Sequence, residues 1–442
     1  MIRQTTTTRT ALLLTMCAGM FLVQLDVTVV NVALPTIGAR LGADLPTLQW
    51  IVAGYAVVLA AFLLSGGALG DVVGHRRVVV GGFALFGAAS AGCALAPSGP
   101  VLVSFRLLQG LGAALLLPGT LAVITRAYPR RREQARALGV WAGVSALALA
   151  GGPVLGGLLV AAWSWRVLFW LNVPLVAVAI AATLRVVPES REPGRRPDFA
   201  GAVTGAVALA ALVYAVIQGA VAAAVLAVVS ATAFVLAERR AADPMLPPAL
   251  VRSRQFTGAN LVAGAMNFVG LGMILVLTLY LQGVLGYPPL SAAVRLLPGF
   301  LPLSLMAPVT GRLTGKFGPR PLMIAGLALG AVALLNLLRV SPDSGYLTVL
   351  PTWFGLGLGM GLLTAAVVAA AVGGAPGEYA GAASGVNNTA RQAFGAIGTA
   401  VFGAVAGEPA HPAAFVSGLH TAGLLGAAVW VAAIALTVRT VR

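Results

Sequence analysis

The feature that most constrains this chain is a long stretch without charge. Residues 199–237 contain 39 residues and not one charged side chain. A single helix of that length would be about 58 Å long, roughly twice the thickness of the hydrocarbon core of a bilayer. Two helices with a tight turn at Gln218 and Gly219 fit better. The arginine pairs on either side would then face the same side of a membrane, which requires an even number of crossings.

Apolar segments of this kind recur along the whole chain, and we count fourteen that are long enough to cross a membrane as helices. They are too long and too uniformly apolar for the strands of a barrel. The composition agrees, because 59% of the 442 residues are hydrophobic and 9% are charged, against about 25% charged in a soluble domain. The expected fold class is an all-α polytopic membrane protein.

The net charge of +16 does not indicate a nucleic-acid-binding domain, because the basic residues lie in small clusters between apolar segments. With both termini in the cytoplasm, 22 of the 28 basic residues fall in cytoplasmic loops, and Arg40, Arg166 and Arg339 fall outside. The other three, Arg106, Arg295 and Arg391, lie within spans. The amino terminus is interpreted as a cytoplasmic tail rather than a cleaved signal peptide.

Two of the expected cytoplasmic loops resemble each other. The loop at 67–77 follows the second span, and the loop at 311–320 follows the tenth, 244 residues later. Internal symmetry of this kind is typical of transporters built from two repeated halves. The alternative is that any short cytoplasmic loop tends to collect glycine and arginine.

Asp26 is the one acidic residue that the sequence places well within a span. A carboxylate at that depth costs at least about 2.5–3.5 kcal/mol, so it is a candidate functional residue. Asp26 lies about 22 Å from the inner face and Arg106 about 8 Å from the outer face, and in a core about 30 Å thick these depths coincide. We expect an ion pair or a shared polar site between the first and fourth spans. The alternative is a static pair that only fixes helix packing.

Several motifs resemble those of the major facilitator superfamily, and in particular its fourteen-span drug:proton antiporters. The loop at 67–77 resembles the superfamily's loop motif, with Val72 where an arginine is usual, and in the second copy Gly315 replaces the acid. Four further segments resemble motifs of the first, fourth, fifth and thirteenth spans: 25–35, 106–112, 151–157 and 381–392. The segment 163–174 is similar to the W-R-W-x-F-x-x-N-x-P segment of the antiporter family. The resemblance implies two six-helix bundles plus two extra central helices, with boundaries at 1–190, 191–254 and 255–442.

The resemblance also implies a function. It is that of a proton-coupled secondary transporter that exports lipophilic small molecules, such as drugs or antibiotics, by alternating access. Its place would be the bacterial inner membrane, with both termini cytoplasmic. Proton coupling is assigned to Asp26 and Arg106. A conformational gate is expected at a cytoplasmic latch between the bundle ends and at small residues of the fifth span that allow close helix packing: Asp71, Arg76, Arg77, Gly152, Pro153, Gly156 and Gly157. The alternatives are an ordinary positively charged cytoplasmic loop and ordinary small-residue packing.

The candidate substrate-binding residues are polar or flexible side chains within the spans: Gln24, Asn31, Tyr55, Gln109, Asn260, Met266, Asn267, Tyr280, Gln282, Asn387 and Arg391. No metal and no cofactor are expected, since Cys17 and Cys93 have no metal-ligand spacing and no catalytic motif is present. The expected partners are a small lipophilic solute, protons and lipid, with no nucleic acid, and the chain is expected to be monomeric. Two alternatives remain open, namely a proton-linked uptake carrier of the same fold and a transport-inactive membrane sensor.

Overall fold

The computed structural model describes residues 6–189, 198–241, 244, 246–376 and 379–441, and within these ranges the chain forms helices and no strands. The elements are α1 (Thr6–Leu41), α2 (Leu45–Val73), α3 (His75–Leu95), α4 (Gly99–Ala127), α5 (Arg131–Ala162), α6 (Trp165–Trp170), α7 (Asn172–Val186), α8 (Phe199–Gln218), α9 (Val221–Arg240), α10 (Pro248–Arg252), α11 (Arg254–Leu279), the π-helix η1 (Tyr280–Val284), α12 (Pro289–Phe317), α13 (Pro319–Leu335), the 3-10 helix η2 (Asn336–Arg339), α14 (Tyr346–Gly373), α15 (Ala380–Ala406) and α16 (Pro412–Thr440).

Thirteen segments in the described ranges are long and apolar enough to cross a membrane. The short helix α6 and α7 together form one of them. The remaining helix of spanning length is α15, which is more polar because it carries Asn387, Asn388, Arg391 and Gln392. Its 27 residues extend about 40 Å, and it packs against α2 and α11. The chain is therefore an all-α polytopic membrane protein, and α15 accounts for the fourteenth expected span.

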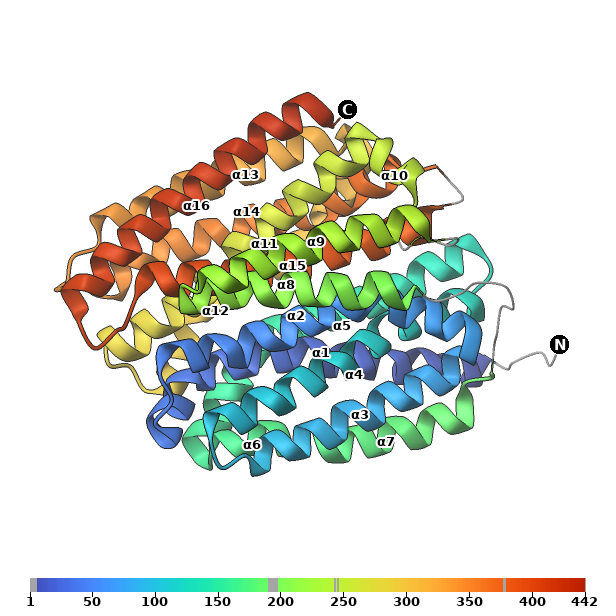
Figure 1. Ribbon diagram of the computed structural model, residues 1–442, viewed down its shortest axis with the longest axis horizontal. Coiled ribbons are helices and arrows are strands. Elements are labelled where there is room, and N and C mark those ends of the chain that lie inside the picture. The colour runs from blue at the N-terminus through green and yellow to red at the C-terminus, as the bar shows by residue number, and fades with distance from the viewer. Residues whose placement is uncertain (1–5, 190–197, 242–243, 245, 377–378, 442) are drawn as a thin grey trace.

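The spanning helices lie side by side in one elongated bundle, and the start of α1 and the end of α16 lie toward the same end of it (Figure 1). We call this end, which carries Arg76, Arg77, Arg126, Arg240 and Lys316, the basic end. The other is called the opposite end. The spans from α1 to α7 form one half of the bundle, and those from α11 to α16 form the other (Figure 1). The two halves meet along α5 with α12 and along α2 with α15.

Of the two extra helices, α8 lies over the seam between α2 and α15, and α9 packs against α8. Apolar side chains of α8, including Val213 and Ile217, pack against Ala53 of α2 and Ala400 of α15. The expected turn after Gln218 is confirmed, because Gly219 has φ 65° and α9 begins at Val221. Glycine adopts such a conformation at little cost. The expected domain boundary at residues 190 and 191 lies outside the described residues, as do Arg195 and Arg196.

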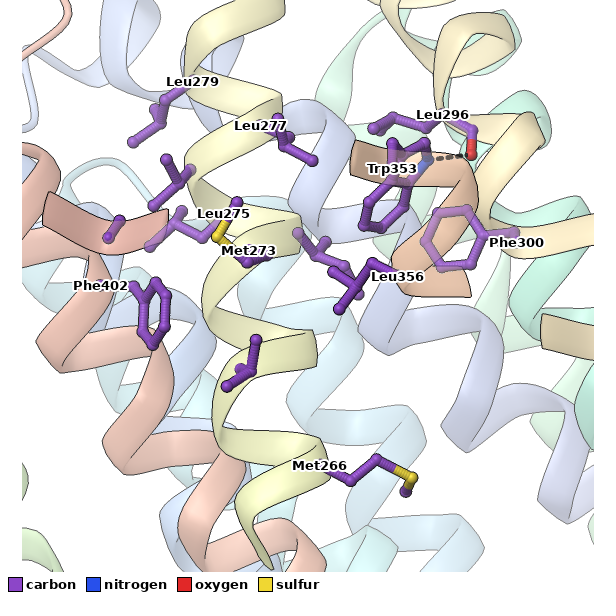
Figure 2. Packing of buried hydrophobic residues seen from close by; sticks show 14 of the residues in the cluster. Met266, Met273, Leu275, Leu277, Leu279, Leu296, Phe300, Trp353, Leu356 and Phe402 are labelled. Atoms are coloured by element: carbon purple, nitrogen blue, oxygen red, sulfur yellow. Dashed lines mark hydrogen bonds between the residues drawn. The ribbon is translucent and has the colours of Figure 1, made fainter. Parts of the chain in front are cut away.

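Burial separates central from peripheral helices. In the most apolar part of α11, 78% of the residues are buried, against 11% in α9. Figure 2 shows the packing around α11: the Trp353 and Phe300 rings meet edge to face with centroids 5.4 Å apart, and the Trp353 indole nitrogen donates to the carbonyl oxygen of Leu296 at 2.5 Å. Helix α11 is therefore a central element of its half, whereas α9 presents most of its surface outward.

The two similar loops have a common backbone geometry. Gly74 joins α2 to α3 with φ 112°, and Gly318 joins α12 to α13 with φ 80°. In each half the glycine connects corresponding helices at the basic end. The shared geometry supports an internal repeat over chance similarity of two short loops.

Candidate functional site

Asp26 of α1 and Arg106 of α4 are in contact at the centre of the first half. Arg106 Nη1 donates to Asp26 Oδ2, and the two side chains are 1% and 2% exposed. The sequence placed these residues at matching depths in different spans, and the expected contact is present. Because both charges are withdrawn from solvent, each depends on the other and on nearby hydrogen bonds for its stability.

Gln109 connects the ion pair to the surrounding helices. Its Nε2 donates to Asp26 Oδ1 at 2.8 Å and to Ser90 Oγ at 2.9 Å, and its Oε1 accepts from Arg106 Nη1 at 2.7 Å. Arg106 Nε also donates to the carbonyl oxygen of Ile51 at 2.9 Å. The guanidinium carbon lies 4.3 Å from the centroid of the Tyr55 ring. Both oxygens of Asp26 therefore accept hydrogen bonds, as a charged carboxylate requires.

Three participants in this network were not among the predicted site residues. Asn172 Nδ2 donates to Ser90 Oγ at 3.3 Å, and Cys93 Sγ lies 3.7 Å from Gln109 Oε1. Ser90 and Cys93 are three residues apart in the third span, so they lie on one helix face. The sequence signal for their role was this spacing of two polar side chains on one face, but it does not reveal which other helix that face contacts.

A small cavity lies against this cluster, between the two halves. Its volume is about 20 Å³, which holds about one water molecule. It is lined from the first half by Val27, Asn31, Val52, Tyr55, Ala56, Leu59 and Arg106, and from the second by Leu271, Gln392 and Thr399. A drug-sized solute cannot fit in this cavity as it stands, so binding one there requires the lining helices to move apart.

Two lining residues carry buried polar atoms without a hydrogen-bond partner among the described residues, namely Asn31 Oδ1 and the Tyr55 hydroxyl. Such atoms are costly to bury, and their presence at a cavity indicates a place where a ligand can bind. Gln392 and Thr399 were not predicted. They are seven residues apart on α15 and therefore share a helix face.

The predicted glycines of α5 lie at close helix contacts. A Cβ on Gly152 would come 1.9 Å from Thr28 Oγ1, and one on Gly156 would come 3.2 Å from Val29 Cα, both on α1. A Cβ on Gly157 would come 2.8 Å from Leu290 Cα and from Ala293 Cβ, both on α12. Pro153 is buried within the same helix. These small residues thus allow α5 to pack tightly against its own half and, at Gly157, against the other half.

Two side-chain bonds also join the halves at the opposite end. Gln49 Nε2 of α2 donates to the carbonyl oxygen of Ala400 in α15 at 3.2 Å, and Gln282 Nε2 of η1 donates to that of Val32 in α1 at 2.9 Å. Together with the Gly157 contact, these bonds close the opposite end of the seam.

Toward the basic end, glycines on the contact faces of α5 and α12 lie in open space. On α5, Gly139 lies 18 residues, or five full turns, before Gly157, so the two glycines lie on the same helix face. On α12, Gly311 lies 18 residues after Ala293 and shares its face in the same way. A Cβ on Gly139, Gly143, Gly311 or Gly315 would nevertheless have no atom within 4 Å. This conformation is therefore closed at the opposite end and parted at the basic end along α5 and α12.

Asp71 and Glu189 organise the loop at the basic end. His75 Nε2 lies 3.1 Å from Asp71 Oδ1, and Arg126 Nη2 lies 3.4 Å from the same oxygen. Glu189 accepts from the Arg76 backbone nitrogen at 3.2 Å, and its Oε2 lies 3.5 Å from Arg77 Nε. The prediction was that Asp71, Arg76 and Arg77 form a latch between the ends of the two bundles. The contacts named here tie α2 to α4, and α3 to the segment after α7. All of them lie within one half.

The two loop glycines give a matched pair of substitutions. We expect Gly318→Ala to lower the free energy of unfolding by about 1–3 kcal/mol, and with it the unfolding temperature. Backbone strain alone would cause this loss, because the space around Gly318 is open. Gly74→Ala should lower the unfolding temperature further, since the added Cβ would also lie 2.3 Å from Glu189 Oε1. Thermal unfolding of the detergent-purified protein measures both. Equal losses would show that the Glu189 contact is unimportant.

The second half pairs its predicted polar residues across α11 and α15. Asn387 Nδ2 donates to Asn260 Oδ1 at 3.1 Å, and Arg391 Nε donates to Asn267 Oδ1 at 3.3 Å. Of the eleven predicted substrate residues, Asn31 and Tyr55 line the cavity and the other nine do not. Gln109 belongs to the network around Asp26, and four more lie elsewhere. Met266 is fully buried in the apolar core (Figure 2), the Tyr280 hydroxyl donates to the carbonyl of Ser344, Gln282 belongs to the closed end, and Gln24 is half-buried on α1.

Comparison with known families and proteins agrees with this architecture. Residues 16–399 match the model of the Major Facilitator Superfamily. The chain is 38% identical over 400 residues, 88% of its length and 74% of the relative's, to the multidrug resistance protein Stp of Mycobacterium tuberculosis (strain CDC 1551 / Oshkosh). It is 36% identical to the tetracenomycin C resistance and export protein of Streptomyces glaucescens, over 88% of this chain and 74% of that one. It is also 36% identical to the cephamycin export protein CmcT of Amycolatopsis lactamdurans, over 98% and 92%.

Solved structures share the fold. A crystal structure of the peptide transporter POT in complex with sulfate superposes with a TM-score of 0.71 at 17% identity, covering 97% of this chain and 95% of that one. A bacterial homologue of the human lysosomal transporter Spinster, in an inward-facing and unoccupied conformation, gives a TM-score of 0.69 at 16% identity, covering 98% and 97%.

Proposed function

The chain is a member of the major facilitator superfamily and hence a membrane transporter rather than an enzyme, and on this premise we propose that it exports lipophilic small molecules in exchange for protons. The relatives that are named for multidrug resistance, tetracenomycin C export and cephamycin export support export as the direction. The basic end would face the cytoplasm of a bacterial inner membrane, with both termini there, because positively charged loops remain on that side.

The observation that carries this proposal is the buried pair of Asp26 and Arg106 at the wall of a cavity between two halves. A carboxylate inside a membrane protein can change its charge by binding a proton. Protonation of Asp26 would remove the charge that now holds Arg106, and Arg106 lines the cavity. The binding of a proton and the shape and charge of the solute site are therefore linked through one side chain.

A transport cycle follows from this linkage. The solute enters from the cytoplasm while the basic end is parted, and the halves rock until the opposite end opens and the solute leaves. A proton then binds Asp26 from outside, and the return movement releases it to the cytoplasm. Each charge that crosses 100 mV supplies about 2.3 kcal/mol, which sustains a gradient of roughly fiftyfold for one proton against a neutral solute.

The domain arrangement also enters the proposal. The halves 1–190 and 255–442 would move about the central site, and the pair within 191–254 would cover the side where α2 and α15 stay in contact. Because one chain supplies both walls of the cavity, we propose that a monomer transports. Candidate solute contacts are the residues that line the cavity or pair beside it: Asn31, Tyr55, Gln392, Asn387 and Arg391.

Dye accumulation in whole cells tests the direction. In a host without its own drug exporters, the chain should lower the accumulation of lipophilic dyes severalfold. For a neutral dye, 100 mV of membrane potential supports a gradient of roughly fiftyfold. A protonophore should restore the accumulation. A panel of neutral, anionic and cationic dyes covers the unknown specificity. Raised accumulation would instead indicate an uptake carrier, and no change with any dye would favour a transport-inactive sensor.

A further inference from the structure

Arg391 is a second arginine within the spans of the transport pathway, and it differs from Arg106 in its partners. Arg106 is neutralised by Asp26. The hydrogen bond that the structure gives Arg391 runs from Nε to the neutral amide oxygen of Asn267, and no carboxylate forms an ion pair with it in the part of the chain that the structure describes. The guanidinium group has five N–H donors, so the fork formed by its two Nη groups remains available to an acceptor.

The position of Arg391 places this fork beside the cavity. The next residue on α15, Gln392, lines the cavity, and so does Leu271, which follows Asn267 by one turn of α11. A Cβ on Gly395, one turn after Arg391, would meet the Leu271 side chain at 2.5 Å. The Arg391–Asn267 pair therefore lies about one turn, roughly 5 Å, toward the basic end from the cavity. A solute that enters from that end would meet it first.

The charges near the pathway favour an anion. Among the described residues, Asp26 is the one acid that lies far from the ends of a span, and both of its oxygens are engaged by Arg106 and Gln109. The neighbours of Arg391 on the same helix faces are the amides of Asn387 and Asn260, which carry no charge. An uncompensated cation at this depth is costly, and a bound carboxylate or sulfonate would remove that cost while matching the planar fork of the guanidinium.

Resting on the proposed function, we propose that Arg391 binds the acidic group of the solute and that the exported molecules are lipophilic organic anions. The anion's apolar part would occupy the space between the halves, and its acidic group would face the Nη fork. Exchange of one entering proton for one leaving anion moves two charges across the membrane, whereas exchange for a neutral solute moves one. Export of an anion should therefore respond more steeply to the membrane potential.

A matched pair of fluorescent probes tests the proposal. 8-Anilino-1-naphthalenesulfonate is an anion, and N-phenyl-1-naphthylamine is the same ring system without the sulfonate. We expect Arg391→Gln to raise the Kd of the purified full-length chain for the anion about tenfold or more, and that for the neutral probe less than about twofold. Arg391→Lys should give an intermediate anion affinity, because lysine keeps the positive charge but lacks the planar two-pronged fork.

Two controls guard against trivial outcomes. Binding of the neutral probe by Arg391→Gln shows that this variant is folded. Arg295→Gln removes a charge from another span, where the guanidinium lies 3.9 Å from the Tyr287 ring, and it should leave both affinities unchanged. The proposal is overturned if Arg391→Gln weakens both probes equally, or if it leaves the anion's Kd unchanged.

The binding result and the transport result are separable. If cells export the neutral probe in a protonophore-sensitive way while the anion's Kd is indifferent to Arg391, the anion site is wrong and proton-coupled export stands. If the anion's Kd depends on Arg391 but neither probe moves in proteoliposomes with an imposed pH gradient, the anion site stands and the proposed function is wrong.

Discussion

Replacement of Asp26 with asparagine should reduce solute-driven proton movement to the level of protein-free liposomes. Asparagine has nearly the same shape and can still accept from Gln109, but it cannot take up and release a proton at this position. The measurement uses proteoliposomes with a pH-sensitive dye inside, to which a transported solute is added. Wild-type chain should change the internal pH, and the variant should not, even where it still binds the solute.

The variant leaves Arg106 buried without its counter-ion, which costs about 3–5 kcal/mol in buried pairs of soluble proteins. Loss of folding could therefore imitate loss of coupling. The double variant Asp26→Asn with Arg106→Gln removes both charges and should recover much of the thermal stability, yet it should remain uncoupled. If the double variant still exchanged protons for solute, the pair would be a static packing element and the carrier would lie elsewhere.

The second large effect is expected at the contact between α5 and α12. Gly157→Leu should force the two helices apart at the opposite end, because even a Cβ would lie 2.8 Å from Leu290 and Ala293 of the other half. Overpacking of this kind costs about 1–3 kcal/mol, which shifts a conformational equilibrium roughly 5- to 150-fold. Gly143→Leu is the matched control, because Gly143 lies in open space in this conformation. The added side chain should obstruct closure of the basic end and so favour the conformation described here.

Spin-label distances report the shift directly. The exposed Arg136 of α5 and Phe317 of α12 mark the basic end, and the exposed Ala162 and Val294 mark the opposite end. With labels at these positions and the buried native cysteines replaced by serine, Gly157→Leu should lengthen the opposite-end distance and shorten the basic-end one. Gly143→Leu should keep the wild-type distances, and both variants should lose transport. Unchanged distances in Gly157→Leu would mean that this contact does not close the pathway.

The interpretation of the sequence was strongest where a property is local to one segment. Length and the absence of charge identified two helices in 199–237, and the turn falls at Gly219 as expected. Counting residues from the span ends placed Asp26 and Arg106 at one depth, and they are in contact. It was weakest where two distant segments meet. The acidic partner of Arg77 is Glu189, and one wall of the cavity includes Gln392 and Thr399. The sequence around each of these three residues does not show which distant segment it meets.

The amino-acid sequence by itself determined that the chain is a bundle of membrane-spanning helices with an acid and an arginine at matching depth. Burial of apolar side chains in lipid and the cost of charges there act on each segment separately, so the order of residues is enough. Only the tertiary structure decided that α5 meets α12 at Gly157 and parts from it at Gly143, and that Arg391 faces an amide rather than a carboxylate. Those outcomes depend on which helix faces come together, and that choice is made by packing among residues more than a hundred positions apart.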